Sequence, residues 1–418
     1  MELREQIEAL ARDARIASRL VADLDTRHKD AFLLRAAERL EGAKEHILAA
    51  NRADLLEAER RGVEAALLRR LELGGDKWSA MLDGLRQVAA LPDPVGTLSE
   101  TRVRPNGLRV SRMRIPLGVI AIVYESRPNV TVDAAALCVK AGNAVILRGG
   151  SEALRANRAL AEELRAAARE TGVPENAISL VPVSDRAAVD HLLKLDRYID
   201  LLIPRGGPGL IRKVVAESTI PVLKHDAGVC HVFLDASADA EMARAIVRDS
   251  KIRQMAVCNG LETLLCHEAA ARRLLPGLLK ALHEEGVELR GCPKTCDLFA
   301  EARPASEADW ATEYLDKILA VRVVTGIDEA IAHVQRFGTD HTDVIVTNDY
   351  ANAQRWQRRV NSSTVGVNCS TAFADGYRLG LGAEIGISTS KLHAFGPMGL
   401  EELTTRKFVL SGDGQLRE

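Results

Sequence analysis

Cys258 is a candidate covalent nucleophile. It follows the polar segment 249–254 (DSKIRQ), which carries the cations Lys251 and Arg253, and it is followed by Asn259 and a glycine. A thiol near cationic side chains, on a loop before a strand, can have its pKa lowered and react as a thiolate. A buried structural cysteine is the commoner role for this residue type, and composition alone favours that interpretation.

Asn129 closes the segment 124–129 (YESRPN), where an apolar strand is expected to give way to a helix. The carboxyl ends of parallel strands form the mouth of most α/β sites, so a side-chain amide there can donate a hydrogen bond to an oxyanion. Asn129 is also a good helix N-cap, which is the alternative interpretation.

Two glycine-rich segments, 141–151 (AGNAVILRGGS) and 203–209 (IPRGGPG), contain or end predicted strands. Glycines there let a dinucleotide approach the backbone, and Arg148 can meet a phosphate or a ribose oxygen. A plain strand–helix connection with a surface arginine explains the first segment equally well. The second segment opens a helix whose N-terminal amides suit a pyrophosphate, but it is neither a P-loop nor the usual G-x-G-x-x-G.

Two further patterns suggest metal binding at first sight. His333-x7-His341 straddles a predicted helix end, with no cysteine or third histidine close by in the sequence. Capping of the helix that ends near Phe337, or hydrogen bonding to a substrate, is the better explanation. Cys292-x3-Cys296 is the closest pair among seven irregularly spaced cysteines, and no second pair completes a zinc site. We therefore predict no metal.

The elements that must position these residues alternate along the chain. Helical periodicity dominates residues 1 to about 75. From Pro116 the pattern changes to short strands and helices, expected in this order: strand 118–124, helix 130–140, strand 144–148, helix 152–170, strand 178–181, helix 185–195, strand 199–203 and helix 210–217. Such alternation predicts right-handed βαβ units and a parallel sheet, an α/β architecture.

A second α/β series runs over about 229–392, with strands expected at 229–234, 320–324 and 343–347. Two segments fit neither series: 108–115 alternates apolar and basic residues, and 407–410 is strand-like. We interpret them as a β-hairpin extended by pairing. Because free strand edges seek partners, these segments also predict oligomerisation.

Length and composition limit the class of protein. A chain of 418 residues is expected to form two domains. The 56 basic and 58 acidic residues nearly cancel, so no global charge favours nucleic acid or an anionic membrane. The apolar runs are too short to span a bilayer, and the N-terminal residues show no secretory-signal pattern. With the cysteines interpreted as reduced thiols, these features predict a cytoplasmic protein.

Three longer segments resemble the aldehyde dehydrogenase superfamily and, within it, the family of gamma-glutamyl phosphate reductases (glutamate-5-semialdehyde dehydrogenases). The most specific is 324–345 (VTGIDEAIAHVQRFGTDHTDVI), which is similar to that family's signature except at Val334 and Phe337. Segments 379–388 (LGLGAEIGIS) and 396–405 (GPMGLEELTT) also resemble the family. The residues leading into Cys258 differ from the Arg-Pro type of its members. The resemblance covers nearly the whole chain.

The resemblance implies an aldehyde dehydrogenase-like α/β fold. It assigns a Rossmann-type NADP-binding domain to 1–105 and 117–230, and an α/β catalytic domain to 231–393. A small β oligomerisation element corresponds to 106–116 and 405–418.

The resemblance also implies roles for single residues. Cys258 corresponds to the nucleophile, and Asn129 to the amide that stabilises the oxyanion together with the backbone N–H of Cys258. Arg148 stands where the superfamily has a lysine on the adenosine ribose. Ser151 stands where NAD-preferring members often have a glutamate, and loss of that charge should admit a 2′-phosphate. The other implied residues are Gly206 and Gly207 below the pyrophosphate, Glu313 on the nicotinamide ribose, and Arg127, Asn368, Ser370 and Thr371 on the substrate.

The implied reaction is the reduction of L-glutamyl 5-phosphate by NADPH to L-glutamate 5-semialdehyde and phosphate, in proline biosynthesis. Cys258 would expel phosphate and carry a thioacyl group that accepts a hydride. The resemblance further implies a homo-oligomer and a transient complex with a separate glutamate 5-kinase.

Two alternatives stay open. A hydrolytic aldehyde dehydrogenase needs a base, which its members carry as a glutamate in a Glu-Leu-Gly-Gly segment; this chain has 223–228 (LKHDAG) there. His225 and Asp226 are the candidates for a substitute base. The second alternative is a catalytically silent nucleotide-binding protein, and Cys258 with a matching Asn129 argues against it.

Overall fold

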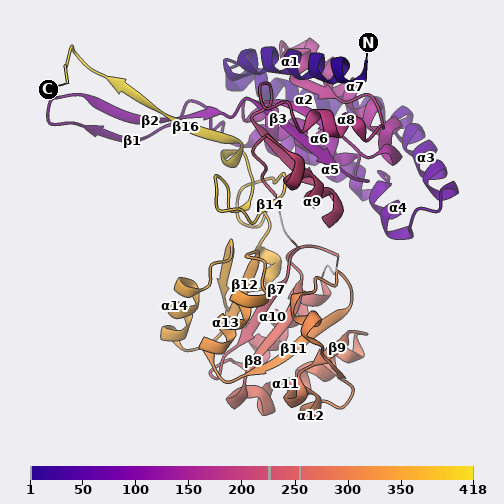
Figure 1. Cartoon of the computed structure of the whole chain (residues 1–418), viewed down its shortest axis with the longest axis vertical. Coiled ribbons are helices and arrows are strands. Elements are labelled where there is room, and N and C mark those ends of the chain that lie inside the picture. The colour runs from indigo at the N-terminus through magenta and orange to yellow at the C-terminus, as the bar shows by residue number, and fades with distance from the viewer. Residues whose placement is uncertain (1, 225–226, 254–255, 418) are drawn as a thin grey trace. The chain divides into compact units, whose positions relative to one another are not determined.

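The structure, a computed structural model, describes residues 2–224, 227–253 and 256–417. The chain divides into two compact units (Figure 1). Unit 1 consists of Met1–Lys224, Leu381–Gly386 and Met398–Glu418, and unit 2 consists of His225–Gly380 and Ile387–Pro397. Each unit contains a parallel sheet, so the predicted α/β class is confirmed. His225 and Asp226, the candidate substitute bases, lie outside the described residues.

A four-stranded parallel sheet forms the centre of unit 1, in the order β5-β4-β3-β6. Its strands are β3 (Val119–Tyr124), β4 (Ala144–Arg148), β5 (Ile178–Leu180) and β6 (Leu201–Arg205). Every side chain of β3 and β4 is buried, as expected for the central strands of a parallel sheet. The strand order reverses between β3 and β6. Ligands of open α/β sheets bind at such a reversal, beside the carboxyl ends of the strands.

Helices surround this sheet, as the sequence pattern predicted. Their bounds are α1 (Leu3–Ala22), α2 (Thr26–Gly42), α3 (Lys44–Arg60), α4 (Ala65–Leu71), α5 (Asp76–Ala90), α6 (Asn129–Lys140), α7 (Leu154–Thr171), α8 (Ala187–Leu192) and α9 (Pro208–Glu217). α1 shows why they form: Ile7, Ala11, Ala14 and Val21 recur at helical spacing and are all buried. The helix expected over 152–170 begins with the 3-10 turn η1 (Ser151–Ala153), and the one expected over 185–195 is shorter because residues 193–195 form turns.

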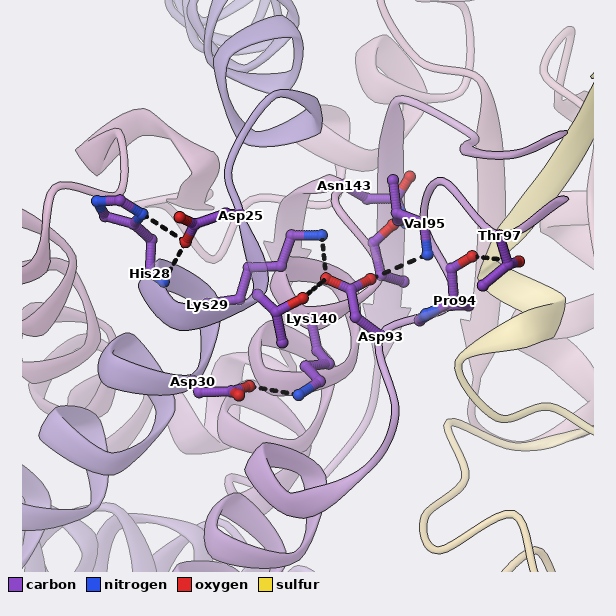
Figure 2. A network of polar contacts seen from close by, with 12 residues as sticks. Asp25, His28, Lys29, Asp30, Asp93, Pro94, Val95, Thr97, Lys140 and Asn143 are labelled. Carbon is purple, nitrogen blue, oxygen red and sulfur yellow. Dashed lines mark hydrogen bonds and ion pairs between the residues drawn. The ribbon is translucent and has the colours of Figure 1, made fainter. Parts of the chain in front are cut away.

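Buried charges connect α2, α6 and the segment after α5 (Figure 2). Lys29 of α2 has a fully buried side chain, and its Nζ lies 2.8 Å from Oδ2 of Asp93, which is 8% exposed. Oδ1 of Asp93 accepts a hydrogen bond from the backbone N–H of Val95. Lys140 of α6 pairs with Asp30 of α2 in the same network. These ion pairs therefore fix the segment that leads from α5 toward the next strand.

An arm of three antiparallel strands extends from the helices of unit 1 (Figure 1). β1 (Leu98–Val103) and β2 (Arg109–Pro116) form a hairpin, and β16 (Thr404–Ser411) pairs along the whole of β2, which confirms the predicted pairing. Asn143 anchors the root of the arm, because its amide donates to the carbonyl of Leu403. Large apolar side chains on the arm are exposed, namely Leu98, Val103, Phe408 and Leu410.

A seven-stranded parallel sheet forms the centre of unit 2, in the order β10-β9-β11-β8-β7-β12-β13. The strands are β7 (Cys230–Leu234), β8 (Leu261–His267), β9 (Glu288–Gly291), β10 (Arg303–Pro304), β11 (Ile318–Val324), β12 (Thr342–Val346) and β13 (Thr364–Val367). The helices are α10 (Ala240–Ile252), α11 (Glu268–Glu284), α12 (Pro293–Leu298), α13 (Ile327–Phe337) and α14 (Tyr350–Arg359). β7, β11 and β12 correspond to the three strands predicted for this half of the chain.

Short elements complete the description: η2 (Glu175–Ala177), η3 (Glu307–Ala311), η4 (Thr371–Phe373), β14 (Ile387–Ser388), β15 (Gly396–Pro397) and η5 (Glu401–Leu403). Within the part of the chain that the structure describes, no helix has both the length and the apolar composition needed to cross a membrane.

We expect Lys29→Met to lower the free energy of unfolding by about 3–5 kcal/mol, because it leaves the carboxylate of Asp93 buried without its cation. Urea unfolding followed by circular dichroism measures the change. The double variant Lys29→Met/Asp93→Asn should recover part of the loss. Arg86→Ala, which breaks the exposed pair with Asp83, is the control and should change stability little. Equal effects of Lys29→Met and Arg86→Ala would contradict this account.

Candidate active site

Cys258 lies in unit 2 on the loop between α10 and β8, and it is half-buried. Gly228 passes directly against this loop, since a Cβ at that position would collide with the carbonyl oxygen of Cys258. The thiol of Cys230 donates a hydrogen bond to the same carbonyl at 3.2 Å. Burial raises the pKa of the Cys230 thiol well above its usual range, so the thiol stays protonated as a donor. Gly228 and Cys230 together therefore fix the backbone that carries the Cys258 side chain.

Glu313 lies in the loop before β11 and binds the same glycine. Its Oε1 accepts a hydrogen bond from the backbone N–H of Gly228 at 2.8 Å. Burial raises the pKa of Glu313, and this hydrogen bond opposes the shift. The structure thus brings two residues named from the sequence, Cys258 and Glu313, onto one backbone support.

A buried ion pair supports both loops. Nζ of Lys251, in the last turn of α10, lies 2.8 Å from Oε2 of Glu262 in β8, and the two side chains are 1% and 0% exposed. Oε1 of Glu262 accepts from the backbone N–H of Leu315, two residues after Glu313. Burial raises the pKa of Glu262 to about 6 and lowers that of Lys251, while their mutual attraction offsets part of both shifts. Lys251, which the sequence placed near the thiol, is therefore engaged by a carboxylate.

Asn129 is the first residue of α6 in unit 1, and a carboxylate orients its amide. Nδ2 donates a hydrogen bond to Oδ2 of Asp133, one turn later, at 2.9 Å. Burial raises the pKa of Asp133 to about 6, and the hydrogen bond from Asn129 opposes this shift. An amide has two N–H donors, and fixing one of them also fixes the direction of the other. The N-cap of α6 is Pro128, without a side-chain cap, so the capping interpretation of Asn129 is wrong.

Gly206 and Gly207 face a carboxylate of the chain itself. Gly207 is the N-cap of α9, and its backbone N–H donates to Oε2 of Glu125 at 2.8 Å. A Cβ on Gly206 would lie 2.6 Å from the carboxyl carbon of Glu125. Because Glu125 follows β3 and α9 follows β6, this contact spans the reversal of the strand order. A helix N-terminus attracts anions, and here the chain supplies one.

Arg148 ends β4, and its side chain is held at the carboxyl edge of the sheet. The guanidinium donates hydrogen bonds to the carbonyls of Gly149, Ser184 and Asp185. Its buried Nε has no partner among the residues that the structure describes. Burial lowers the pKa of Arg148, but an arginine keeps its charge. The charge of Arg148 is therefore held in a fixed place at this edge of the sheet.

Ser151 is exposed, and the next residue, Glu152, places a carboxylate at the same edge of the sheet. Oε1 of Glu152 accepts from the backbone N–H and the hydroxyl of Ser126 at 2.9 and 2.6 Å, and Oε2 lies 3.3 Å from Oγ of Ser151. Burial alone would raise the pKa of Glu152, but the hydrogen bonds from Ser126 lower it overall. Ser126 has a left-handed φ of 36°, a strained value found often at functional sites. Arg127, the following residue, is half-buried.

The residues expected to contact the substrate tail hold their own loop in place. The side-chain amide of Asn368 donates to the carbonyl of Thr347 and accepts from its N–H. Oγ of Ser370 lies 3.1 Å from Oγ of Ser250 in α10, and the backbone N–H of Thr371 donates to the same Ser250 oxygen. The buried Oγ1 of Thr371 has no hydrogen-bond partner within the described ranges. This loop is therefore tied to the end of α10.

A cavity of about 220 Å³ opens in unit 2 beside the Cys258 loop. Val257 and Asn259, the two neighbours of Cys258, form part of its wall. The charged side chains that line it are Asp249, Arg253, Asp375 and Arg378. Sequence analysis drew attention to 249–254 but not to the second pair, because only the fold brings these two segments together.

His333 and His341 lie in the interior of unit 2. The ring of His333 contacts those of His231, Trp310 and Phe337, and burial, aided by His231, lowers the pKa of His333 to about 2. Nδ1 of His341 lies 2.9 Å from Oγ1 of Thr342. The capping interpretation is wrong, because the C-cap of α13 is Gly338, whose N–H bonds to a backbone carbonyl. In the ranges that the structure covers, no group of three or more His, Cys, Asp or Glu is placed to hold a metal ion.

Comparisons with known proteins show what the chain is similar to. Residues 2–288 match the aldehyde dehydrogenase family. The chain is 54% identical over 418 residues to the gamma-glutamyl phosphate reductase of Geotalea daltonii, covering 100% of both chains. It is 51% identical to that of Caldanaerobacter subterraneus subsp. tengcongensis, covering 99% of this chain and 100% of the relative. The crystal structure of gamma-glutamyl phosphate reductase from Thermotoga maritima superposes with a TM-score of 0.96 at 43% identity, over 99% of this chain and 100% of that one.

We expect Glu125→Gln to bind NADPH about five-fold more tightly than the wild type, because it removes a negative charge from the N-terminus of α9. Fluorescence titration with NADPH measures the dissociation constant. Glu162→Gln, on the exposed face of α7, is the matched control and should leave that constant unchanged. Weaker binding by Glu125→Gln would show that the carboxylate contributes to the ligand site instead of competing for it.

Proposed function

This chain belongs to the aldehyde dehydrogenase family, among its gamma-glutamyl phosphate reductases, and on that premise we propose that it reduces L-glutamyl 5-phosphate to L-glutamate 5-semialdehyde and phosphate. NADPH is the proposed electron donor and proline biosynthesis the proposed pathway. The observation that carries the proposal is the half-buried Cys258 on a loop whose carbonyl is fixed by Gly228 and Cys230.

In the proposed mechanism, the Cys258 thiolate attacks the acyl carbon of the substrate. A C–S bond forms, the C–O bond to phosphate breaks, and phosphate leaves with the electron pair. When bound, NADPH supplies the hydride that reduces the resulting thioester carbon. The amide of Asn129 and the backbone N–H of Cys258 stabilise the oxyanion. As the carbonyl re-forms, the C–S bond breaks, the aldehyde leaves and the thiolate is restored.

A fixed nucleophile matters for this chemistry. Misplacing reacting atoms by about 1 Å can cost roughly 10²-fold in rate. The contacts of Gly228 with Cys258 and Glu313 position the loop without using the thiol itself. Glu313, proposed to bind the nicotinamide ribose, is therefore supported by the same backbone as the nucleophile.

Unit 1 contains the other residues proposed to bind the cofactor, and their chemistry fits a phosphorylated dinucleotide. Gly206 and Gly207 present the N-terminus of α9 to the pyrophosphate once Glu125 withdraws from it. Arg148 and Ser151 are proposed to accept the 2′-phosphate, the first as a cation and the second as a neutral donor. Glu152 keeps its negative charge close to Ser151, and Ser126 holds its Oε1 in a fixed position. Equal catalytic efficiency with NADPH and NADH would contradict the preference.

The proposed cofactor-binding and catalytic roles correspond to the two units. Unit 1 is the proposed NADP-binding domain with the arm, and unit 2 is the proposed catalytic domain. The boundary between the units lies after Lys224, where the sequence predicted it after 230, and residues 381–386 belong to unit 1. Substrate contacts are proposed for Arg127, Asn368, Ser370 and Thr371. Of the last three, Thr371 offers a buried hydroxyl without a partner in the described part of the chain.

We also propose a homo-oligomer that forms through the arm. The supporting observation is a three-stranded sheet whose outer strands, β1 and β16, expose backbone edges and apolar side chains. Light scattering of the intact chain and of one ending before Lys407 tests the proposal; a monomer mass for the intact chain would reject it.

A transient complex with glutamate 5-kinase would hand over the labile acyl phosphate. The seven free thiols support a reducing cytoplasm.

We expect Cys258→Ala to abolish turnover while folding and NADPH binding stay near wild type, because only the covalent step is lost. Turnover is followed by NADPH absorbance, and binding by fluorescence. Cys296→Ala, another half-buried cysteine of unit 2, is the matched control and should keep most of the activity. Near-normal turnover by Cys258→Ala would reject the assignment of the nucleophile.

We expect the reverse reaction, oxidation of L-glutamate 5-semialdehyde with NADP⁺, to depend on added phosphate and to release only traces of glutamate. The segment 223–228 lacks the glutamate that hydrolytic members use, and general-base assistance is worth roughly 10²–10⁴-fold. The assay compares NADPH formation with and without phosphate. Rapid formation without phosphate would favour the hydrolytic alternative, and His225→Ala and Asp226→Asn would then identify the base.

A further inference from the structure

We infer that the cavity beside the Cys258 loop binds the α-amino-acid head group of the substrate, with Arg253 and Arg378 on its carboxylate and Asp249 and Asp375 on its ammonium. This inference rests on the proposed function, which assigns substrate contacts to Arg127 and the 368–371 loop but names no partner for the two charges of the head group. It identifies the residues that would distinguish a glutamyl substrate from a simple acyl phosphate of similar length.

The place of the cavity fits the length of the substrate. Its wall includes Val257 and Asn259, so it begins one residue away from Cys258 on either side. In a glutamyl group, three C–C bonds of about 1.5 Å separate the acyl carbon from the α-carbon, which spans roughly 4 Å. This is close to the spacing of neighbouring Cα atoms, about 3.8 Å. A glutamyl chain carried by Cys258 is therefore about as long as the one-residue step that separates Cys258 from each of these two wall residues.

The charges of the cavity fit a zwitterion. Two guanidinium groups and two carboxylates line it. Arg253 lies 3.2 Å from Asp249, and their side chains are 58% and 40% exposed, so this pair stays accessible to a ligand. Oδ1 of Asp375 accepts from the backbone N–H of Arg378, which leaves the guanidinium outside that bond. Arginine can bind a carboxylate through two parallel N–H donors, and each Asp can accept from an ammonium.

The same charges disfavour the other anion of the reaction. Inorganic phosphate carries between one and two negative charges at neutral pH and would meet Asp249 and Asp375 together with the arginines. Like charges in one small site repel each other, whereas a zwitterion has a carboxylate for the arginines and an ammonium for the aspartates. The head group is therefore favoured over the leaving phosphate.

Hydrogen bonds hold the two walls of the cavity together. Oγ of Ser250, next to Asp249, binds Ser370 and the backbone N–H of Thr371. On the other side, Nδ2 of Asn259 donates to the carbonyl of Ala374, next to Asp375. The carboxylates therefore stand on backbone segments that are fixed before any ligand arrives, which lowers the entropy lost on binding.

The test uses L-glutamate as a ligand that needs no turnover. Iodoacetamide alkylates Cys258, mass spectrometry follows the rate, and L-glutamate should protect the thiol in the wild type. In Arg253→Met and Arg378→Met the half-protecting concentration should rise roughly ten-fold or more, the change expected when a charge-assisted hydrogen bond is lost. Glutarate lacks the ammonium and 4-aminobutyrate lacks the α-carboxylate, so both should protect the wild type less well.

Arg303→Met, which removes an exposed arginine paired with Glu288 in the same unit, is the matched control and should be protected like the wild type. Equal protection of both cavity variants by L-glutamate, or no protection of the wild type, would overturn the inference. Protection by inorganic phosphate that both variants lose would assign the cavity to the leaving group and also overturn it. Turnover of L-glutamate 5-semialdehyde by the wild type tests the proposed function separately, because the protection assay requires no reaction.

Discussion

The close approach of Gly228 to the carbonyl of Cys258 is the constraint on which the candidate active site depends. Any side chain at 228 would displace the loop of Cys258, and the N–H of the same glycine binds the carboxylate of Glu313. The thiol of Cys230, two residues later, donates to the carbonyl of Cys258. The short segment 228–230 therefore positions both the Cys258 loop and the Glu313 side chain.

The sequence predicted what is encoded locally. The apolar runs at 119–124 and 144–148 became buried strands, and the Cys258 loop lies between a helix and a strand as expected. The hydrogen bond between Glu125 and Gly207, and the meeting of Asp249 with Asp375 in one cavity wall, were not predictable, because each joins segments that are far apart in the sequence. Asn129 is a third case. It lies at the start of a helix as predicted, but its side chain binds Asp133 and does not cap the helix.

The segment 324–345, which carries the most specific part of the family resemblance, contributes residues that stabilise the interior of unit 2. Nδ1 of His231 lies 2.7 Å from Oδ1 of Asp343, both side chains are fully buried, and Ser362 bonds to the other oxygen of that aspartate. This arrangement links β7 to β12 through side chains as well as through the backbone. Because β7 begins two residues after Gly228, it keeps the segment that contacts the Cys258 loop in register with the rest of the sheet. Similarity to a family at such residues therefore indicates that the proteins share the same domain interior, and it says less about which ligands they share.

The connectivity of the two units has a consequence for biosynthesis on the ribosome. The chain passes between units four times, after Lys224, Gly380, Gly386 and Pro397, so unit 2 is made while unit 1 is still incomplete. β2 must wait for β16, and the amide of Asn143 must wait for the carbonyl of Leu403, until residues 403–411 have been translated. Unit 2 can acquire its parallel sheet during that interval. In the nascent chain, the hairpin of the arm therefore keeps one edge open until unit 2 has been made.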